Sequence, residues 1–254
     1  MPTRRALTAL TACALAVVLG AREARACGVS VGGAPGACSV AEHEASLRKY
    51  RLGVSYAYTR TRIQFSNGSE IDAERDAVMA TFEVKLGKRF VLSFGAGALA
   101  WGTLGAPSDK AHPVREVRPG PVLAVSLAYT LVPQEEVGRP FVLLTGTFAG
   151  LITSTAPDVG RRDDVGYQAF DLRFGALVGT RVPLGRVALV PYAVARAFGG
   201  PILWSMGDAS VLGTDAYKHQ LGGGAIVSIG PVDAFIEGVA IGERALVGGL
   251  GVSF

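Results

Sequence analysis

The sequence closes with the stretch Leu250-Gly251-Val252-Ser253-Phe254. Successive side chains of a β-strand point to opposite faces, so Leu250, Val252 and Phe254 would share one face of such a strand. Residues 244–249 keep the alternation and fill the other face with mostly small side chains. The pattern predicts a C-terminal amphipathic strand that carries its large apolar side chains on one side only.

The first residues of the chain have the composition of an export signal. Arg4 and Arg5 supply a positive region, residues 6–20 supply an apolar core, and Ala24-Arg25-Ala26 matches a small-residue cleavage site. The apolar run is shorter than the ~20 residues of a transmembrane helix. We therefore predict a cleaved signal peptide over residues 1–26.

Most of the net positive charge of the chain lies in that leader. The 254 residues carry a formal net charge of +4, and residues 1–26 hold four arginines and one glutamate. Removing the leader takes away three positive charges and leaves +1. The basic balance therefore reflects export, and we expect no nucleic-acid partner.

The rest of the chain divides into ten segments of strand length with alternating polarity. They are residues 48–65, 75–87, 89–102, 114–131, 139–154, 166–182, 186–199, 216–229, 232–241 and the C-terminal strand. Each is near or above the ~9–11 residues that a tilted strand needs to cross a bilayer. We predict an all-β fold, an antiparallel up-and-down transmembrane β-barrel of about ten strands over residues 47–254, after a periplasmic segment at 27–46.

Segment 166–182 shows the alternation most clearly. Its apolar side chains recur at every second position, at Phe170, Leu172, Phe174, Ala176 and Val178. Asp171, Arg173 and Arg181 lie on the opposite face with glycines. The apolar row is expected to face lipid and the polar row to face the barrel interior.

The lengths of the connections alternate along the chain. Tight turns are expected near 87–89, 182–186 and 229–232, and longer polar links at 66–74, 103–113, 155–165 and 200–215. Outer-membrane barrels have short periplasmic turns and long external loops. An even number of strands then places both ends of the barrel domain on the periplasmic side, although the link at 241–244 is short for an external one.

Aromatic residues fall near the expected strand ends, which is typical of the aromatic girdles at membrane interfaces. We expect a periplasmic girdle and an external girdle. Their members would be Tyr50, Phe90, Phe141 and Phe254 on the periplasmic side, and Tyr58, Trp101, Trp204 and Tyr217 on the external side.

The export signal, the alternating segments and the terminal Phe254 together resemble the small bacterial outer-membrane β-barrel proteins as a class. This resemblance implies location in the outer membrane, contact with its lipid, and recognition of Leu250, Val252 and Phe254 by the barrel-assembly machinery. The alternative is a secreted lipocalin-like β-barrel that binds a small apolar ligand.

Two cysteines remain once the leader is removed. Cys27 and Cys38 both precede the first strand, and two nearby thiols in an oxidising compartment favour a disulfide. Lipidation of Cys27 is the alternative, but Ala24-Arg25 matches a lipoprotein cleavage site poorly.

The chain lacks the residue patterns of the enzymes known on such barrels. Omptin-like proteases use paired aspartates and an Asp-x-His motif, whereas His219 follows Asp215 at four residues. Outer-membrane deacylases use a His-Ser pair, which neither His112 nor His219 supplies, and His43 lies before the first strand. We expect no catalytic site, no metal site and no cofactor.

Charged residues on the expected interior face are the best candidates for function. They are Glu83, Lys85, Asp171, Arg173, Arg181, Arg196 and Glu237. These charges either pair with one another and fill a narrow barrel, or line a pore or pocket for small solutes. Both alternatives stay open at this point.

Overall fold

A computed structural model describes residues 49–105, 115–156, 165–206 and 209–254 of the chain. Residues 1–26, the segment 27–46, Cys27, Cys38, His43 and His112 lie outside the described residues. Within the described ranges, no helix is long and apolar enough to span a membrane.

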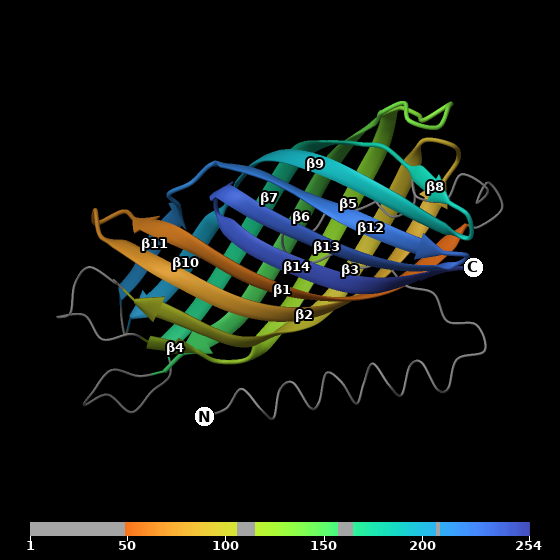
Figure 1. The fold of residues 1–254 in the computed structure, drawn as a ribbon. Helices are drawn as coiled ribbons and strands as arrows, with labels where there is room; N and C mark the ends of the chain where they lie inside the picture. The colour runs from red at the N-terminus through yellow and green to blue at the C-terminus, as the bar shows by residue number, and fades with distance from the viewer. Residues whose placement is uncertain (1–48, 106–114, 157–164, 207–208) are drawn as a thin grey trace.

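Ten long antiparallel strands form a closed ring in the described part of the chain (Figure 1). In ring order they are β1 (Tyr50–Phe65), β2 (Glu70–Leu86), β3 (Phe90–Gly105), β5 (Gly120–Val132), β6 (Phe141–Thr155), β7 (Val165–Gly179), β9 (Val187–Gly199), β12 (His219–Ile229), β13 (Val232–Gly242) and β14 (Arg244–Ser253). Strand β14 pairs back with β1, which closes the ring. The predicted fold class is confirmed.

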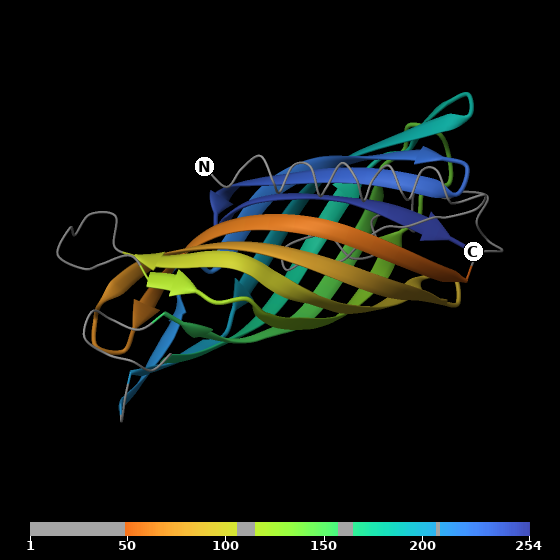
Figure 2. The same ribbon diagram turned by 90° about the horizontal axis from the view of Figure 1, so that it is seen from below.

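The barrel has two different ends, which Figures 1 and 2 place at opposite sides of the molecule. One end holds Phe254 and the tight connections β2–β3 and β12–β13, and we call it the turn end. The other holds the short strands β4 (Arg115–Val117), β10 (Pro201–Met206) and β11 (Ala209–Asp215), and we call it the hairpin end. Strand β8 (Val182–Leu184) forms a short hairpin with β9 at the turn end.

The ring narrows at the hairpin end. There β10 pairs with β7 and β11 pairs with β1, so this hairpin takes the place of β9, β12, β13 and β14 in the wall. In the same way β4 pairs with β3 and β6 in place of β5. Eight strands therefore surround the lumen at this level, and barrel diameter falls with strand number.

Two of the expected long links are wrong. Residues 200–215 form the β10–β11 hairpin rather than a loop, and β2 begins at Glu70, so the β1–β2 link is confined to residues 66–69. In β2 the reason is that the first outward-facing residues, Glu70, Asp72 and Glu74, are polar, so the apolar alternation on which the expected boundary rests begins later than the strand.

The outer surface carries an apolar band, as the alternation predicts. In β7, Leu172, Phe174 and Val178 are exposed while Arg173 and Leu177 are buried. The same outward rows continue around the ring, with Leu123 at 63% exposure on β5. Large apolar side chains on the outside suit lipid, and they do not fit the soluble lipocalin-like alternative.

Ion pairs mark the edge of the band toward the hairpin end. On the outer face of β1 and β2, Arg60 pairs with Asp72 and Glu74, and Arg62 pairs with Asp72 and Glu70. Charged side chains are tolerated at the membrane interface but not in the hydrocarbon core. This ladder therefore marks the level at which the outer surface changes from apolar to charged.

The girdle prediction is wrong for two of its aromatic residues. Tyr50, Phe90 and Phe254 are exposed at the turn end, and the ring of Tyr50 lies 6.1 Å from that of Phe254. Phe141, however, is fully buried inside the barrel, and Trp204 is 4% exposed with its indole donating to Thr155. Both sit at interior positions of the alternation, where they fill the lumen.

Two apolar clusters fill much of the interior. The cluster nearer the turn end includes Phe141, Val190, Ile226, Phe235 and Val247. The cluster nearer the hairpin end includes Ile63, Phe65, Leu104, Tyr167 and Trp204. The charged residues of the lumen lie beside and between these clusters.

Candidate functional site

A connected network of charged and polar side chains lies inside the barrel along four neighbouring strands, β7, β9, β12 and β13. Its first part centres on Arg173 of β7, which pairs with Asp171 on the same strand and donates through Nη1 to Glu243 Oε2 at 2.7 Å. The guanidinium also lies 5.0 Å from the centre of the Phe198 ring. Arg173 therefore ties β7 to the β13–β14 turn, although β9 and β12 lie between these strands in the sheet.

The second part centres on Arg196 of β9. Its Nη1 and Nη2 donate to the two carboxylate oxygens of Glu237 on β13, at 2.8 and 3.0 Å. The Tyr192 hydroxyl donates to the same carboxylate at 3.1 Å. A bidentate arginine–carboxylate pair is strong and fixes orientation, so this pair holds its two strands in one arrangement.

Gln220 of β12 joins the two parts. Its amide nitrogen donates to Glu243, and its amide oxygen accepts from Arg196 at 3.5 Å. Gln220, Glu237 and Glu243 are each no more than 1% exposed. The hydrogen-bonded chain thus runs without a break from Asp171 to Tyr192.

A glycine places Glu243 in this network. Gly242 has a φ of +84°, and a Cβ there would lie 1.7 Å from the carbonyl oxygen of His219. Only glycine suits such a position. The resulting turn aims Glu243 into the lumen rather than out to solvent.

A further ion pair lies nearer the turn end. Arg51 of β1 pairs with Asp233 of β13, and both side chains are almost fully buried. Because β14 lies between these strands in the sheet, this contact also ties non-adjacent strands.

The structure gathers four of the seven interior charges named from the sequence. Asp171, Arg173, Arg196 and Glu237 belong to the network. Glu83 is buried and Lys85 half-buried on the interior face of β2, closer to the turn end. Arg181 follows β7 at the turn end, where its backbone N–H donates to Gln134 at 2.7 Å.

Sequence reasoning missed several members of the interior. They are Arg51, Arg75, Tyr192, Asp215, Gln220, Asp233 and Glu243. Arg51, Gln220 and Asp233 could have been found, because each keeps the period-2 alternation of its strand. Asp215 and Glu243 fall in stretches expected to be links, so no alternation marked them.

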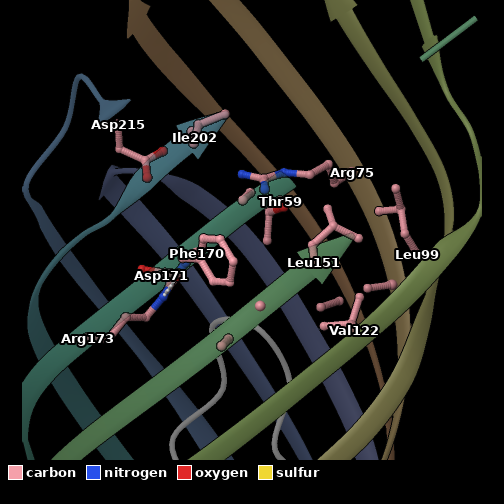
Figure 3. Close-up of a pocket in the computed structure, with 15 residues that line it drawn as sticks. Thr59, Arg75, Leu99, Val122, Leu151, Phe170, Asp171, Arg173, Ile202 and Asp215 are labelled. Carbon is pink, nitrogen blue, oxygen red and sulfur yellow. Dashed lines mark hydrogen bonds and ion pairs between the residues drawn. The ribbon is translucent and has the colours of Figure 1, made fainter. Parts of the chain in front are cut away.

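A small cavity opens beside the network toward the hairpin end (Figure 3). Its volume is about 40 Å³. Its lining is charged on one side and apolar on another. Charged and polar lining residues are Thr59, Arg75, Asp171, Arg173 and Asp215, and apolar ones include Leu99, Val122, Leu151 and Ile202.

Asp215 is an unusual carboxyl at this cavity. It lies in the β10–β11 hairpin and accepts a hydrogen bond from Thr61 Oγ1 at 3.0 Å. Burial raises the pKa of Asp215 to about 6, although Arg75 and the bond from Thr61 oppose the rise. The side chain therefore titrates within a range that cells and experiments can reach.

His219, which the sequence comparison set against the Asp-x-His motif, differs from Asp215 in its surroundings. His219 is exposed at the start of β12, whereas Asp215 is buried. Across the described residues, no group of three or more His, Cys, Asp or Glu side chains could hold a metal ion.

The chain matches no protein-family model and no curated protein. Among solved structures it is similar to the outer membrane protease OmpT from Escherichia coli, with 8% identity, a TM-score of 0.47, and coverage of 81% of this chain and 97% of that one. It is also similar to the transport unit of the autotransporter AIDA-I from Escherichia coli, with 10% identity, a TM-score of 0.46, and coverage of 86% and 96%.

A third similar structure is the translocator domain of the autotransporter NalP from Neisseria meningitidis, with 12% identity, a TM-score of 0.43, and coverage of 86% and 91%. The class-level resemblance to outer-membrane β-barrel proteins is thus found among solved structures. Likeness at these scores says nothing about activity, and the barrel architecture rests on the strand pairings themselves.

Proposed function

We propose that this protein is a closed, non-enzymatic barrel of the outer membrane, with a structural or surface-interaction role. The observation that carries the proposal is the unbroken network from Asp171 to Tyr192, which ties β7, β9, β12, β13 and the β13–β14 turn together inside the barrel.

A pore of this width would need hydrated charges along a continuous path. The charges of this network are instead bonded to one another, with Arg196 and Glu237 at most 2% exposed. A ten-stranded barrel leaves little lumen once long side chains occupy it. Apolar clusters on either side of the network further oppose a water-filled path.

The proposal that the protein is not an enzyme rests on its side chains. The described lumen shows arginine–carboxylate pairs rather than a nucleophile held beside a base. Asp171 and Glu243 are both bonded to Arg173, and carboxylates held by an arginine in this way suit a structural role.

Outer-membrane location completes the proposal. The apolar outer band and the charged edge of β1 and β2 suit a bilayer, and the export signal over residues 1–26 supplies the route. The hairpin end then faces the outside and the turn end the periplasm. Phe254, exposed at the turn end, is available to the assembly machinery.

A narrow channel is the second candidate, because the cavity beside Arg75 and Asp215 shows that the lumen is not filled throughout. Current recording in a planar bilayer separates the two. A closed barrel gives a silent, folded protein, and Arg173→Glu lowers its stability. Stable openings whose charge selectivity changes in Arg173→Glu would contradict the closed barrel.

A further inference from the structure

The lumen cavity is lined by an arginine and an aspartate that each carry one buried atom without a hydrogen bond among the described residues. Arg75 Nε and Asp171 Oδ1 are buried and make no hydrogen bond there. Figure 3 shows both side chains at the cavity, one from β2 and one from β7, with the guanidinium of Arg75 turned toward Asp215. A positively charged hydrogen-bond donor and a negatively charged acceptor thus line the same cavity.

Arg75 differs from the arginines of the network. Arg173 and Arg196 are each bonded to carboxylates, whereas Arg75 forms no ion pair or hydrogen bond within the described residues. Arg75 interacts with Asp215, Asp171 and Glu243 by electrostatic attraction, without a direct bond to any of them. Buried polar groups are nearly always hydrogen-bonded, so Arg75 and Asp171 Oδ1 call for a partner in the cavity.

The size of the cavity limits what that partner can be. A cavity of about 40 Å³ has room for about three water molecules, at roughly 10–15 Å³ each. The smallest amino acid fills a comparable space. Leu99, Leu151 and Ile202 close the apolar side and leave no place for a larger side chain.

We propose that this cavity binds a small zwitterion of glycine size. The carboxylate of the solute accepts two parallel hydrogen bonds from the planar guanidinium of Arg75. Its ammonium group donates hydrogen bonds to Asp171 Oδ1 and to the carboxylate of Asp215. This binding site goes beyond the closed structural role, and it does not depend on whether the barrel conducts.

The test is isothermal titration calorimetry on the full protein purified from membranes and held folded in detergent. Glycine is expected to bind at a single saturable site. Acetate supplies only the anion and methylammonium only the cation, so each should bind at least tenfold more weakly. Leucine should not bind, because its side chain exceeds the cavity.

Variants locate the site. Arg75→Met should weaken glycine binding at least tenfold, and Arg75→Lys should fall between that variant and the unaltered protein, because lysine keeps the charge but not the fork. Arg186→Met is the matched control, since Arg186 is exposed in the β8–β9 turn. If Arg75→Met fails to fold, as judged by a heat-dependent gel shift, Asp171→Asn is the second variant and should also weaken binding.

Three outcomes would overturn the proposal. The first is the absence of saturable heat when glycine is added to the unaltered protein, which would leave a cavity for water only. The second is binding of glycine to Arg75→Met or Asp171→Asn as tight as to the unaltered protein. The third is binding of acetate or methylammonium as tight as that of glycine, which would indicate a site for a single ion. Bilayer currents test the closed barrel separately, so failure of one proposal is distinguishable from failure of the other.

Discussion

Arg196 and Glu237 bond to each other across strand β12, which lies between their own strands β9 and β13 in the sheet. The contact is possible because the interior positions of β12 beneath it are Gly222 and Gly224, which have no side chain to intervene. A Cβ on Gly224 would lie 2.7 Å from the Tyr192 hydroxyl.

Gly224→Ala should therefore destabilise the barrel. The added methyl group would displace Tyr192 from Glu237 and also approach the carbonyl oxygen of Ile236, and overpacking of this kind costs about 1–3 kcal/mol. Gly238→Ala is the control, because a Cβ at Gly238 meets no atom within 4 Å. Urea unfolding of both variants in lipid bilayers checks the difference, and equal stability of the two would contradict the packing.

Glu237→Leu should cost about 3–5 kcal/mol of unfolding free energy, because it leaves Arg196 buried without its carboxylate. Replacing both partners with leucine should recover most of that loss. The exposed pair Arg139–Glu136 is the comparison, and Arg139→Leu should change stability by less than ~1 kcal/mol. A double variant no more stable than Glu237→Leu would show that the pair matters for another reason.

Phe174→Arg should cost about 2–4 kcal/mol, since Phe174 is 60% exposed on the outer face of β7 and a charge there meets the hydrocarbon core. Phe174→Leu should be nearly neutral. The measurement is reversible unfolding in bilayers. An unchanged stability of Phe174→Arg would mean that β7 is shifted by one residue, because that shift exchanges the two faces.

Asp215 should make stability depend on pH. Its pKa is raised from 3.8 to about 6, so the folded protein holds the proton more tightly than the unfolded chain does. Stability should then fall as pH rises from about 4 to about 6, by on the order of 2–3 kcal/mol. Unfolding measured at several pH values should show this slope in the unaltered protein. A similar slope in Asp215→Asn would assign the effect to another group.

Deletion of Phe254 should affect assembly more than stability. The Phe254 side chain is 54% exposed. Its backbone exchanges two hydrogen bonds with Tyr50, at 2.9 and 3.1 Å, at the end of an otherwise complete ladder. The truncated protein should fold in detergent yet reach the outer membrane in reduced amount. Normal membrane levels, measured by cell fractionation, would remove Phe254 from the assembly signal.

The sequence alone predicts the wall of the barrel well. A one-residue shift would put Arg173 in lipid and Phe174 in the lumen, so burial fixes the register of β7 strongly. The same alternation places Arg196 and Glu237 inside. Each of these statements depends only on residues near one another in the chain.

Contacts between distant residues could not be predicted in the same way. Arg173 and Glu243 are 70 positions apart, and nothing in either local pattern names the other as its partner. Glu243 also stands in a turn, where alternation gives no direction. The β10–β11 hairpin could not be predicted because its strands are short. Its inward-facing Ile202 and Trp204 therefore fall within a predicted loop.

The closure of the wall on β1 constrains the order in which the protein can fold. Strand β1 comes first among the described strands, yet it pairs with β11 at Ile63 and with β14 at Leu52, and β14 is the last strand of the chain. Contacts of such long separation form slowly, and an unpaired strand edge is prone to pair with other chains. Until most of the chain has been made, the edge of β1 has no native partner besides β2, and the ring cannot close before β14 is available.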